Sequence, residues 1–487
     1  MTDQIHRSST GVDVPGVSRR DLLKGGVAGA TAIALTALAG QQAAAGRGVT
    51  PARGPRKGGY GPVRPAVDQA TGLELLALPE GFTYFSYGWT GQTMSDGRPT
   101  PTDHDGMAVV AKRGRDICLV RNHELSQGES AQAIVEGGTY NPDEYGGTTN
   151  LVFDTVAGRF TDSYTSLGGT IRNCAGGPTP WSSWISCEET FHPWGSRDDG
   201  VNHGYVFDVP GFGISDGRAI TAAGRFSHEA VAVDPKTGIV YETEDAGSSA
   251  LYRYLNPAGK KGIADGGELQ AMVVRGTSRF DLTQGFAAGT TFPITWEAVG
   301  DPEGRTGRAF DSAPDAAVIS RGEGAWWDAG LCWFVSTDGG AAGLGQVWAL
   351  DPKRDELTMV YESPSSSEVD GPDNITISPR GGIVLCEDGD SNPKRLVGLS
   401  QRGEVFTLVE NRIDLGPGDL ARIDDVFPGV GADFWDNRSD EPDEDGVGDY
   451  ASSEWAGATF HRDWLFANVQ SPGVTFAITG PWQRGAL

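Results

Sequence analysis

Residues that can bind metal ions recur at the ends of short apolar strands in this sequence. In 373–388 and 174–189, such a residue is followed by proline six positions later and by acidic residues 14 and 15 positions later. Four further copies are less regular. The first members of the six copies are Asp105, Cys174, Glu229, Glu323, Asp373 and Glu454. The second members are Glu124, Glu188 with Glu189, Glu244 with Asp245, Thr337 with Asp338, Glu387 with Asp388, and Asn468.

The chemical types of these residues predict a site for more than one kind of metal. Clustered carboxylates favour Ca²⁺, which accepts about six to eight oxygen ligands. A thiolate among them favours a transition metal, with iron and zinc as the candidates. Acidic residues at strand ends also form turns, but Cys174 does not fit that explanation. The other cysteines, which lie in apolar second strands and are interpreted as core residues, are Cys118, Cys187, Cys332 and Cys386.

Basic and polar residues beside these ligands could bind an anion and take part in catalysis. Arg321 and Arg172 each lie two positions before a ligand, so regular strand alternation would place them on the ligand face. Arg121, Asn122 and His123 end the second strand of the copy that begins at 105. An arginine here could bind phosphate in a bidentate manner, or form only a structural salt bridge. A mixed metal site with such arginines fits phosphate ester hydrolysis by a metal-held oxygen nucleophile.

Each copy has the pattern of a β-hairpin, which would bring its ligands together. In 229–245, alternating apolar residues precede the turn Pro235-Lys-Thr-Gly238, and a second apolar run follows. Proline fixes φ and glycine tolerates positive φ, so this segment predicts a tight turn. The start of the first strand and the end of the second then lie at the same edge, and Glu229 is expected beside Glu244 and Asp245.

Six such hairpins predict an all-β fold, a six-bladed β-propeller with loop insertions. Their starts lie 50 to 94 residues apart, and a four-stranded blade needs about 40–50 residues. All six edges would face one end of a central channel and form the metal site there. The interpretation treats 67–487 as a single β-propeller catalytic domain.

The N-terminal segment predicts export. Residues 1–45 combine the twin-arginine pattern Ser18-Arg19-Arg20 with an apolar stretch and a small-residue cleavage site. We expect the protein in the periplasm, at the cell surface or outside the cell, with the twin-arginine translocation machinery as a partner. A retained membrane anchor is the alternative, but the stretch is short and rich in glycine. Residues 46–66 are basic, rich in Gly and Pro, and predicted to be a flexible linker.

Composition excludes several other functions. The formal net charge of −26 disfavours nucleic acids and anionic membranes as partners. Five cysteines show no disulfide framework. The acidic stretch 443–449 could chelate Ca²⁺ but lacks the full EF-hand ligand order. No GxSxG, P-loop or HExxH motif is present.

Several segments resemble the PhoX-type alkaline phosphatase family. They are RNHE (121–124), NCAGGPTPWSSWISCEE (173–189), HEAVAVDPKTGIVYETED (228–245), RGEG (321–324), DGPDNITISPRGGIVLCED (370–388) and NVQSPG (468–473). The resemblance covers roughly 70–473, and the twin-arginine leader matches too. Ser471 departs from the family pattern, where many members have histidine, and the chain is shorter than the larger members.

The resemblance implies a six-bladed propeller with a mixed Fe(III) and Ca²⁺ centre and an oxo-bridged cluster. It also implies hydrolysis of phosphate monoesters at alkaline pH for phosphate scavenging. By position, Cys174 and Glu189 would bind iron, and Arg321 would bind phosphate. The full set of expected metal ligands is Cys174, Glu188, Glu189, Glu229, Glu244, Asp245, Glu323, Asp373, Glu387, Asp388, Glu454 and Glu124.

The sequence thus favours an exported iron- and calcium-dependent phosphatase, monomeric and acting on small phosphorylated substrates. Two alternatives remain open at this point. One is a Ca²⁺-dependent lactonase or another esterase on a propeller, and the other is a calcium-stabilised binding propeller without catalysis. Cys174 and Arg321 disfavour the lactonase, because that chemistry needs neither. Fold alone does not separate the three, since propellers have many functions.

Overall fold

The computed structural model describes residues 59–126, 132–191, 200–431 and 446–487. The predicted signal peptide and residues 46–58 of the predicted linker lie outside these ranges. Within them the chain is mostly β-strand, with one α-helix, α2 (Pro417–Val426), so the all-β prediction is confirmed. Short 3-10 helices occur at Thr221–Ala223, Gly259–Lys261, Ala309–Ser312 and Trp482–Arg484. The described part contains no helix long and apolar enough to span a membrane.

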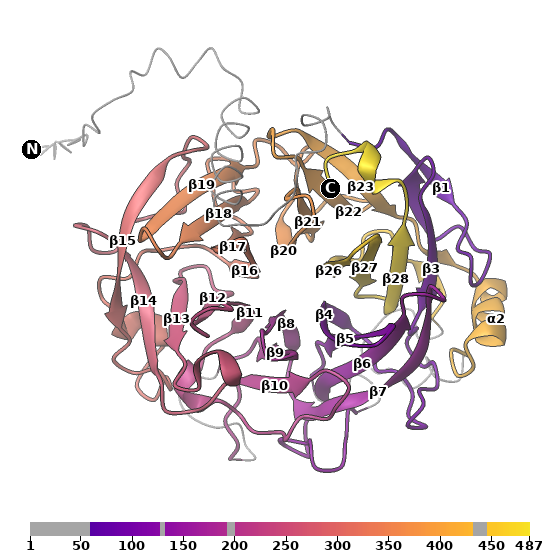
Figure 1. Ribbon diagram of the computed structural model, residues 1–487, viewed down its shortest axis with the longest axis horizontal. Coiled ribbons are helices and arrows are strands. Elements are labelled where there is room, and N and C mark those ends of the chain that lie inside the picture. The colour runs from indigo at the N-terminus through magenta and orange to yellow at the C-terminus, as the bar shows by residue number, and fades with distance from the viewer. Residues whose placement is uncertain (1–58, 127–131, 192–199, 432–445) are drawn as a thin grey trace, which may run out of the picture.

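The strands form antiparallel sheets arranged radially around a centre (Figure 1). One sheet contains β4 (His104–Arg113), β5 (Asp116–His123), β6 (Gly146–Asp154) and β7 (Arg159–Thr170). The next contains β8 (Asn173–Pro178), β9 (Ser183–Glu188) and β10 (Val206–Pro210). Another contains β26 (Trp455–His461), β27 (Trp464–Val469), β28 (Val474–Thr479) and β3 (Thr83–Tyr87).

Two larger sheets and a short pair complete the fold. In order of pairing, the first contains β11 (His228–Val233), β12 (Val240–Glu244), β13 (Tyr252–Leu255), β14 (Glu268–Val274), β15 (Thr291–Ala298), β19 (Glu356–Glu362), β18 (Gln346–Asp351), β17 (Leu331–Ser336) and β16 (Gly322–Asp328). The second contains β1 (Val63–Ala66), β2 (Leu76–Pro79), β23 (Val405–Asn411), β22 (Arg395–Leu399), β21 (Ile383–Glu387) and β20 (Pro372–Ile377). The short pair is β24 (Asp414–Leu415) with β25 (Gly448–Asp449).

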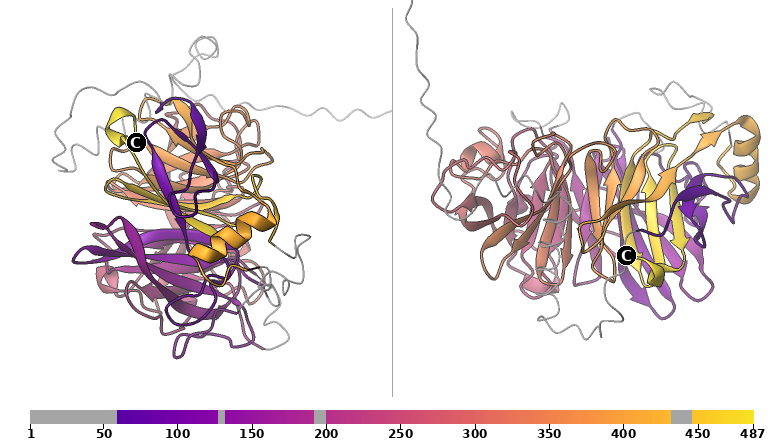
Figure 2. Two further views of the ribbon diagram at one scale, coloured as in Figure 1. Left: turned by 90° about the vertical axis from the view of Figure 1, so that its right-hand side faces the viewer. Right: turned by 90° about the horizontal axis from the view of Figure 1, so that it is seen from above.

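The innermost strands form a closed ring. Strands β4, β8, β11, β16, β20 and β26 each contact the next, and β26 contacts β4 (Figure 1). The nine-stranded sheet supplies two of them, because β15 and β19 pair at its outer side. The molecule is therefore propeller-like, and Figure 2 shows it edge-on with α2 on the outside.

The two ends of the described chain close the ring together. Strand β3, from the N-terminal part, pairs with β28, from the C-terminal part, and Tyr84 lies opposite Ile478. Residues 59–66 of the predicted linker also belong to the fold, which corrects its boundary. Strand β1 pairs with β2, and the Tyr60 hydroxyl donates hydrogen bonds to the carbonyl oxygens of Trp482 (3.1 Å) and Leu487 (3.0 Å). The Gly- and Pro-rich composition concealed this strand.

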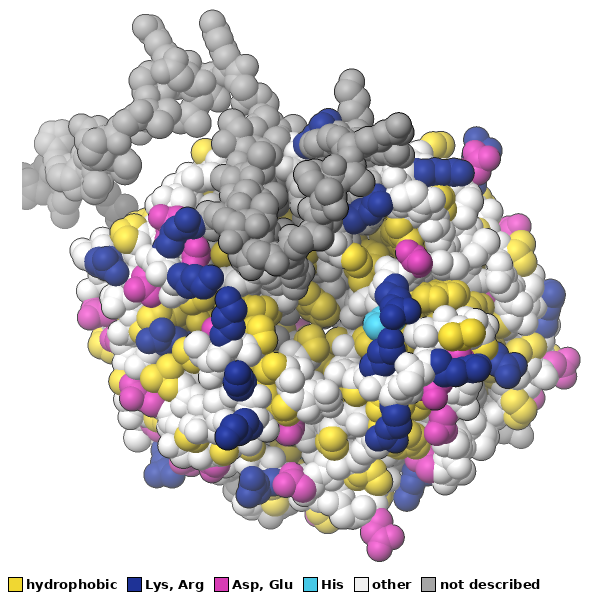
Figure 3. Space-filling view, viewed as in Figure 1, with side chains coloured by type: hydrophobic (Ala, Val, Ile, Leu, Met, Phe, Trp, Pro, Cys, Tyr) yellow, Lys and Arg dark blue, Asp and Glu magenta, His cyan; other side chains and the backbone are white. Residues whose placement is uncertain are grey.

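Apolar side chains fill the space between neighbouring sheets. The largest cluster joins the sheets of β20–β23 and β26–β28 and contains Trp455 and Phe476, both buried. Cys118, Cys187, Cys332 and Cys386 lie on second strands, buried and free, as the sequence predicted. On the face seen in Figure 3, lysine and arginine side chains are spread around the ring and a hollow lies at its centre. The acidic surplus of the chain is thus not concentrated on this face.

Candidate metal centre

Side chains that could bind metal converge from neighbouring sheets at the edge where the innermost strands begin. They form three groups in which all ligand atoms lie within 4.8 Å of one another. The groups are Asp105, Glu124 and Cys174; Cys174, Glu189 and Glu229; and Glu229, Glu323 and Asp373. Cys174 belongs to the first two groups and Glu229 to the last two. Seven side chains therefore form one continuous row across the ring.

A β-bulge sets the direction of the first ligand in each inner strand. Strand β4 pairs with β5 at His104–His123, and regular pairing resumes only at Met107–Arg121. The same irregularity follows the first residue of β8, β11, β16, β20 and β26. A bulge adds one residue to a strand and redirects its side chain. In β4, β8, β11, β16 and β20 the irregularity includes a residue of the row, such as Asp105 or Cys174.

Small residues directly after the ligands let the inner strands approach each other. A Cβ atom on Gly106 would lie 2.6 Å from the Cα atom of Ala175. A Cβ atom on Gly324 would lie 2.6 Å from the Cα atom of Asn374. Such distances exclude a side chain at either glycine. The close approach of the backbones explains why ligands from four neighbouring sheets come within coordination distance.

The hairpin edges are paired as the sequence predicted in the first five copies. The backbone N–H groups of Glu189 and Asp245 donate to the carbonyl oxygens two positions before their ligand partners, at 2.8 and 3.1 Å. The sixth copy differs, because Gln470 rather than Asn468 occupies this edge and its N–H donates to the Glu454 carbonyl oxygen. Asn468 lies deeper and donates from Nδ2 to the Asp105 carbonyl oxygen at 2.6 Å.

Of each pair of adjacent acids, only the second faces the centre, because neighbouring strand residues point to opposite faces. The first acid of each pair forms hydrogen bonds with residues outside the row. Glu188 accepts hydrogen bonds from His203 and three backbone N–H groups. Glu244 binds Arg308 and the Tyr252 hydroxyl. Arg395 donates two hydrogen bonds to Glu387 at 2.6 and 2.8 Å. The structure does not bring Glu188, Glu244 or Glu387 into the row.

Three further predicted ligands lie at the margin of the row. Asp245 accepts hydrogen bonds from Arg321. Asp388 lies 3.6 Å from the ammonium group of Lys394. Burial is the main cause that raises the pKa of Glu454, and the carboxylates of Asp388, Asp373 and Asp105 raise it further. Glu454 therefore lies near the row. Lys394 was missed by the sequence analysis, and only its position shortly after an acidic pair could have indicated it.

Two arginines reach the row from the same position in their copies. Arg172 pairs with Glu124 and Glu189, and Arg321 pairs with Asp245 and with Glu323 at 2.7 Å. Their backbones have φ values of 48° and 43°, a left-handed conformation that is strained for a residue with a Cβ atom. Such strain is concentrated at functional sites. Both arginines approach the ligands through this bend, not through the strand alternation that we had expected.

The other three predicted catalytic residues are held inside the protein. Arg121 donates to the Gly88 carbonyl oxygen and to Thr475. His123 contacts the Thr102 carbonyl oxygen and Thr149. Asn122 donates from Nδ2 to the Cys174 carbonyl oxygen at 3.0 Å, so it positions the ligand strand. Strand membership alone did not reveal that these side chains point between sheets.

Burial and mutual repulsion shape the electrostatics of the row. Burial raises the pKa of Glu229 well above its ordinary value, and Glu323 and Asp373 raise it further. Burial likewise raises the pKa of the Cys174 thiol, with Asp105 as the next cause. The pKa of Asp105 rises to about 7 for the same reason. Among the described residues, neither carboxylate oxygen of Glu229 nor Oδ2 of Asp105 has a hydrogen-bond partner.

These properties fit bound cations. Buried polar atoms without partners are costly, and several anions in contact repel one another. Bound cations would provide partners for the buried polar atoms and reduce the repulsion between the anions. Oxygen and sulfur donors that lie within 4.8 Å of one another can bind the same cation. The donor set of six carboxylates and one thiol fits the predicted combination of hard and softer metal ions.

We expect the chelated protein to lose stability as pH rises from 5 to 8, with its melting temperature falling by roughly 5 °C. The folded pKa values of Glu124, Glu229, Glu323 and Asp373 are raised. The native state therefore holds more protons than the unfolded chain above about pH 4.5, and its stability falls as pH rises. Bound metal favours the deprotonated ligands, so the metal-loaded protein should lack this fall. Melting curves of both forms across this range test the prediction, and parallel curves would contradict it.

Comparisons with known proteins concern the family and the fold of the chain. The family model described as alkaline phosphatase PhoX matches residues 58–163 and 153–473. The solved structure of Pseudomonas fluorescens PhoX in complex with vanadate, a transition state analogue, superposes with a TM-score of 0.58 and 15% identity. The match covers 87% of this chain and 98% of that one. A gluconolactonase from Xanthomonas campestris has a TM-score of 0.32 and 12% identity, with coverage of 78% and 97%. No curated protein sequence matches the chain.

Proposed function

The chain belongs to the alkaline phosphatase PhoX family, and from this premise we propose that it is an exported phosphatase for phosphate monoesters with a mixed iron and calcium centre. The observation that carries the proposal is the continuous row of six carboxylates and one thiol, flanked by two arginines. A row of anions that must be neutralised, with cations at its edge, suits a reaction in which negative charge builds on phosphoryl oxygens.

The residues divide by donor type. Cys174 and Glu189 would hold iron, since a thiolate favours a transition metal. The remaining oxygen donors would hold further iron and calcium; they are Asp105, Glu124, Glu229, Glu323 and Asp373. When bound, these metals supply Lewis acidity and an activated oxygen for attack on phosphorus.

Arg321 is the residue that we propose to bind the phosphate. Its Nε atom donates to Asp245 at 3.0 Å, and its Nη2 atom lies 2.7 Å from Glu323. These contacts fix the guanidinium plane. Within the described residues Nη1 has no hydrogen-bond partner, so we propose that it binds a phosphoryl oxygen. The relative from Pseudomonas fluorescens binds vanadate as a transition state analogue, which supports an anion at the corresponding site here. Arg172, held by Glu124 and Glu189, orients those two ligands.

Further parts of the proposal concern architecture and location. The closed ring of six innermost strands supports a propeller of six blades. The twin-arginine pattern in 1–45 supports export of the folded protein to the periplasm, cell surface or medium. We propose a monomer that releases phosphate from small esters for uptake.

Metal content and turnover measured on the same sample test this function. The mature protein, purified without chelators, is expected to contain iron and calcium and to hydrolyse 4-nitrophenyl phosphate. A lactone is assayed in parallel. Calcium without iron, with lactone hydrolysis and no phosphate release, would replace the phosphatase by the lactonase interpretation. Calcium without either activity would indicate a binding propeller.

A further inference from the structure

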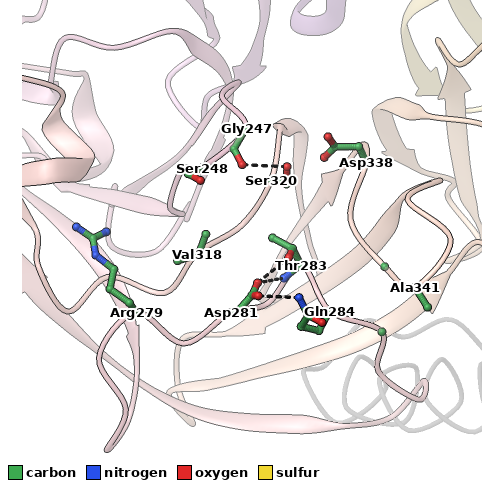
Figure 4. Close-up of a pocket in the computed structure, with 12 residues that line it drawn as sticks. Gly247, Ser248, Arg279, Asp281, Thr283, Gln284, Val318, Ser320, Asp338 and Ala341 are labelled. Carbon is green, nitrogen blue, oxygen red and sulfur yellow. Dashed lines mark hydrogen bonds between the residues drawn. The ribbon is translucent and has the colours of Figure 1, made fainter. Parts of the chain in front are cut away.

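A polar pocket of about 690 Å³ lies between the loops that carry Gly247, Asp281, Ser320 and Asp338 (Figure 4). Its lining residues are Gly247, Ser248, Arg279, Asp281, Thr283, Gln284, Gly285, Val318, Ser320, Asp338, Gly340 and Ala341. Most of them offer a polar side chain or exposed backbone, so the pocket suits a hydroxylated or charged group better than an apolar one.

The pocket adjoins the loops that carry Asp245 and Arg321. Ser320 directly precedes Arg321, and its hydroxyl donates to the Gly247 carbonyl oxygen at 3.2 Å. The Arg321 N–H donates to the Ala246 carbonyl oxygen at 2.8 Å, one residue after Asp245. The same two loops therefore carry Arg321 and Asp245 on one side and the pocket on the other. A phosphate held at Arg321 could direct the rest of its ester into this pocket.

Arg279 is a cation in this pocket without a carboxylate partner. No ion pair joins it to an acid within the described chain, whereas Arg308 and Arg321 each bind carboxylates. Its guanidinium stacks on the Phe310 ring at 4.0 Å and donates from Nη2 to the Phe310 carbonyl oxygen at 3.0 Å. Its φ value of 50° is a strained conformation for arginine. The side chain is thus held in place, and its charge has no ion-pair partner among the described residues.

The two acidic residues of the pocket, Asp281 and Asp338, form no ion pair with Arg279. Asp281 accepts hydrogen bonds from Thr283 and from Gln284, which supplies its Nε2. These bonds lower the pKa of Asp281, so it stays ionised. Its carboxylate oxygens accept hydrogen bonds from residues of the same turn. Asp338 is exposed to solvent. In a strongly acidic protein, an uncompensated arginine in a concave site is best explained by an anionic ligand.

We propose that this pocket binds the organic part of the phosphate ester and that Arg279 binds a second anionic group on it. The favoured substrates are then small polar phosphate monoesters that carry a carboxylate or a second phosphate. The inference rests on the proposed phosphatase function and specifies its substrate class.

Matched substrate pairs measure this preference. The pairs are 3-phosphoglycerate with glycerol 3-phosphate, for a carboxylate, and fructose 1,6-bisphosphate with fructose 6-phosphate, for a second phosphate. The readout is the ratio of kcat/KM within each pair. Arg279→Gln is expected to lower at least one ratio by about tenfold, the size of a charge-assisted hydrogen bond. The pair that responds identifies the anion, and unchanged ratios in both pairs would overturn the proposal.

Two controls separate a pocket effect from a general one. Arg253 also stacks on an aromatic ring, that of Trp296 at 4.4 Å, but lies outside the pocket, so Arg253→Gln should leave the ratios unchanged. If Arg279→Gln does not fold, Ala341→Glu adds a carboxylate to an exposed position of the pocket and should lower the same ratio. Val156→Glu, at a remote exposed position, matches its charge. Equal effects of the remote variants would contradict the proposal, whereas failure of the wild type to hydrolyse any ester would instead overturn the phosphatase function.

Discussion

Replacing Cys174 with alanine is expected to remove iron and to lower phosphate ester turnover at least about 1,000-fold, equivalent to about 4 kcal/mol. Cys174 belongs to two of the three ligand groups, so its loss affects both. It is also the one sulfur donor of the row. Burial and nearby carboxylates raise the pKa of its thiol, which means that a bound metal must favour the thiolate. Iron content and kcat/KM of the purified variant check this result.

A matched control is Cys332→Ala. Cys332 is also free and fully buried, and burial also raises its thiol pKa, but it lies on β17 among apolar residues. Both variants remove a buried sulfur, at a similar cost to packing of about 1 kcal/mol. Only the variant at 174 should lose metal. Full activity in Cys174→Ala with iron still bound would refute the assignment of the thiolate to iron.

The sequence predicted that several of these side chains lie together because its repeat has a physical basis. Alternating apolar residues and turn residues define a hairpin, and a hairpin necessarily brings its two ends to one edge. The sequence pattern alone therefore places Cys174, Glu229, Glu323 and Asp373 together. The sixth copy was harder. Asn468 follows Glu454 at the usual offset of 14 positions, but the edge position proved to be Gln470.

What the sequence did not reveal is which way each side chain points. Glu188 and Glu189 are identical residue types, so the sequence does not distinguish them. The strand register at the bulge decides which of the two faces the centre. The roles of Arg121 and His123 depend on partners more than 20 residues away in the chain. Bulges and left-handed arginines depend on tertiary packing, so local patterns do not predict them.

Replacing Glu229 with glutamine is expected to lower the turnover of the metal-loaded protein but to raise the melting temperature of the metal-free protein. Glu229 lies at the junction of two ligand groups, and the variant keeps its shape but removes its charge. Turnover should fall at least about 1,000-fold through loss of metals from both groups. The chelated variant at pH 8 should nevertheless melt roughly 2 °C or more above the chelated wild type, because a buried repulsive carboxylate is gone.

The control for this experiment is Glu242→Gln on the same sheet. Glu242 is fully buried, its oxygens have no hydrogen-bond partner among the described residues, and burial raises its pKa. It belongs to none of the three ligand groups, so its glutamine variant should keep both metals and turnover. A site selected only for stability would not place repelling carboxylates in contact at Glu229. If Glu229→Gln raises the melting temperature in both the chelated and the metal-loaded state, the row is not held together by metal, and its acids need another explanation.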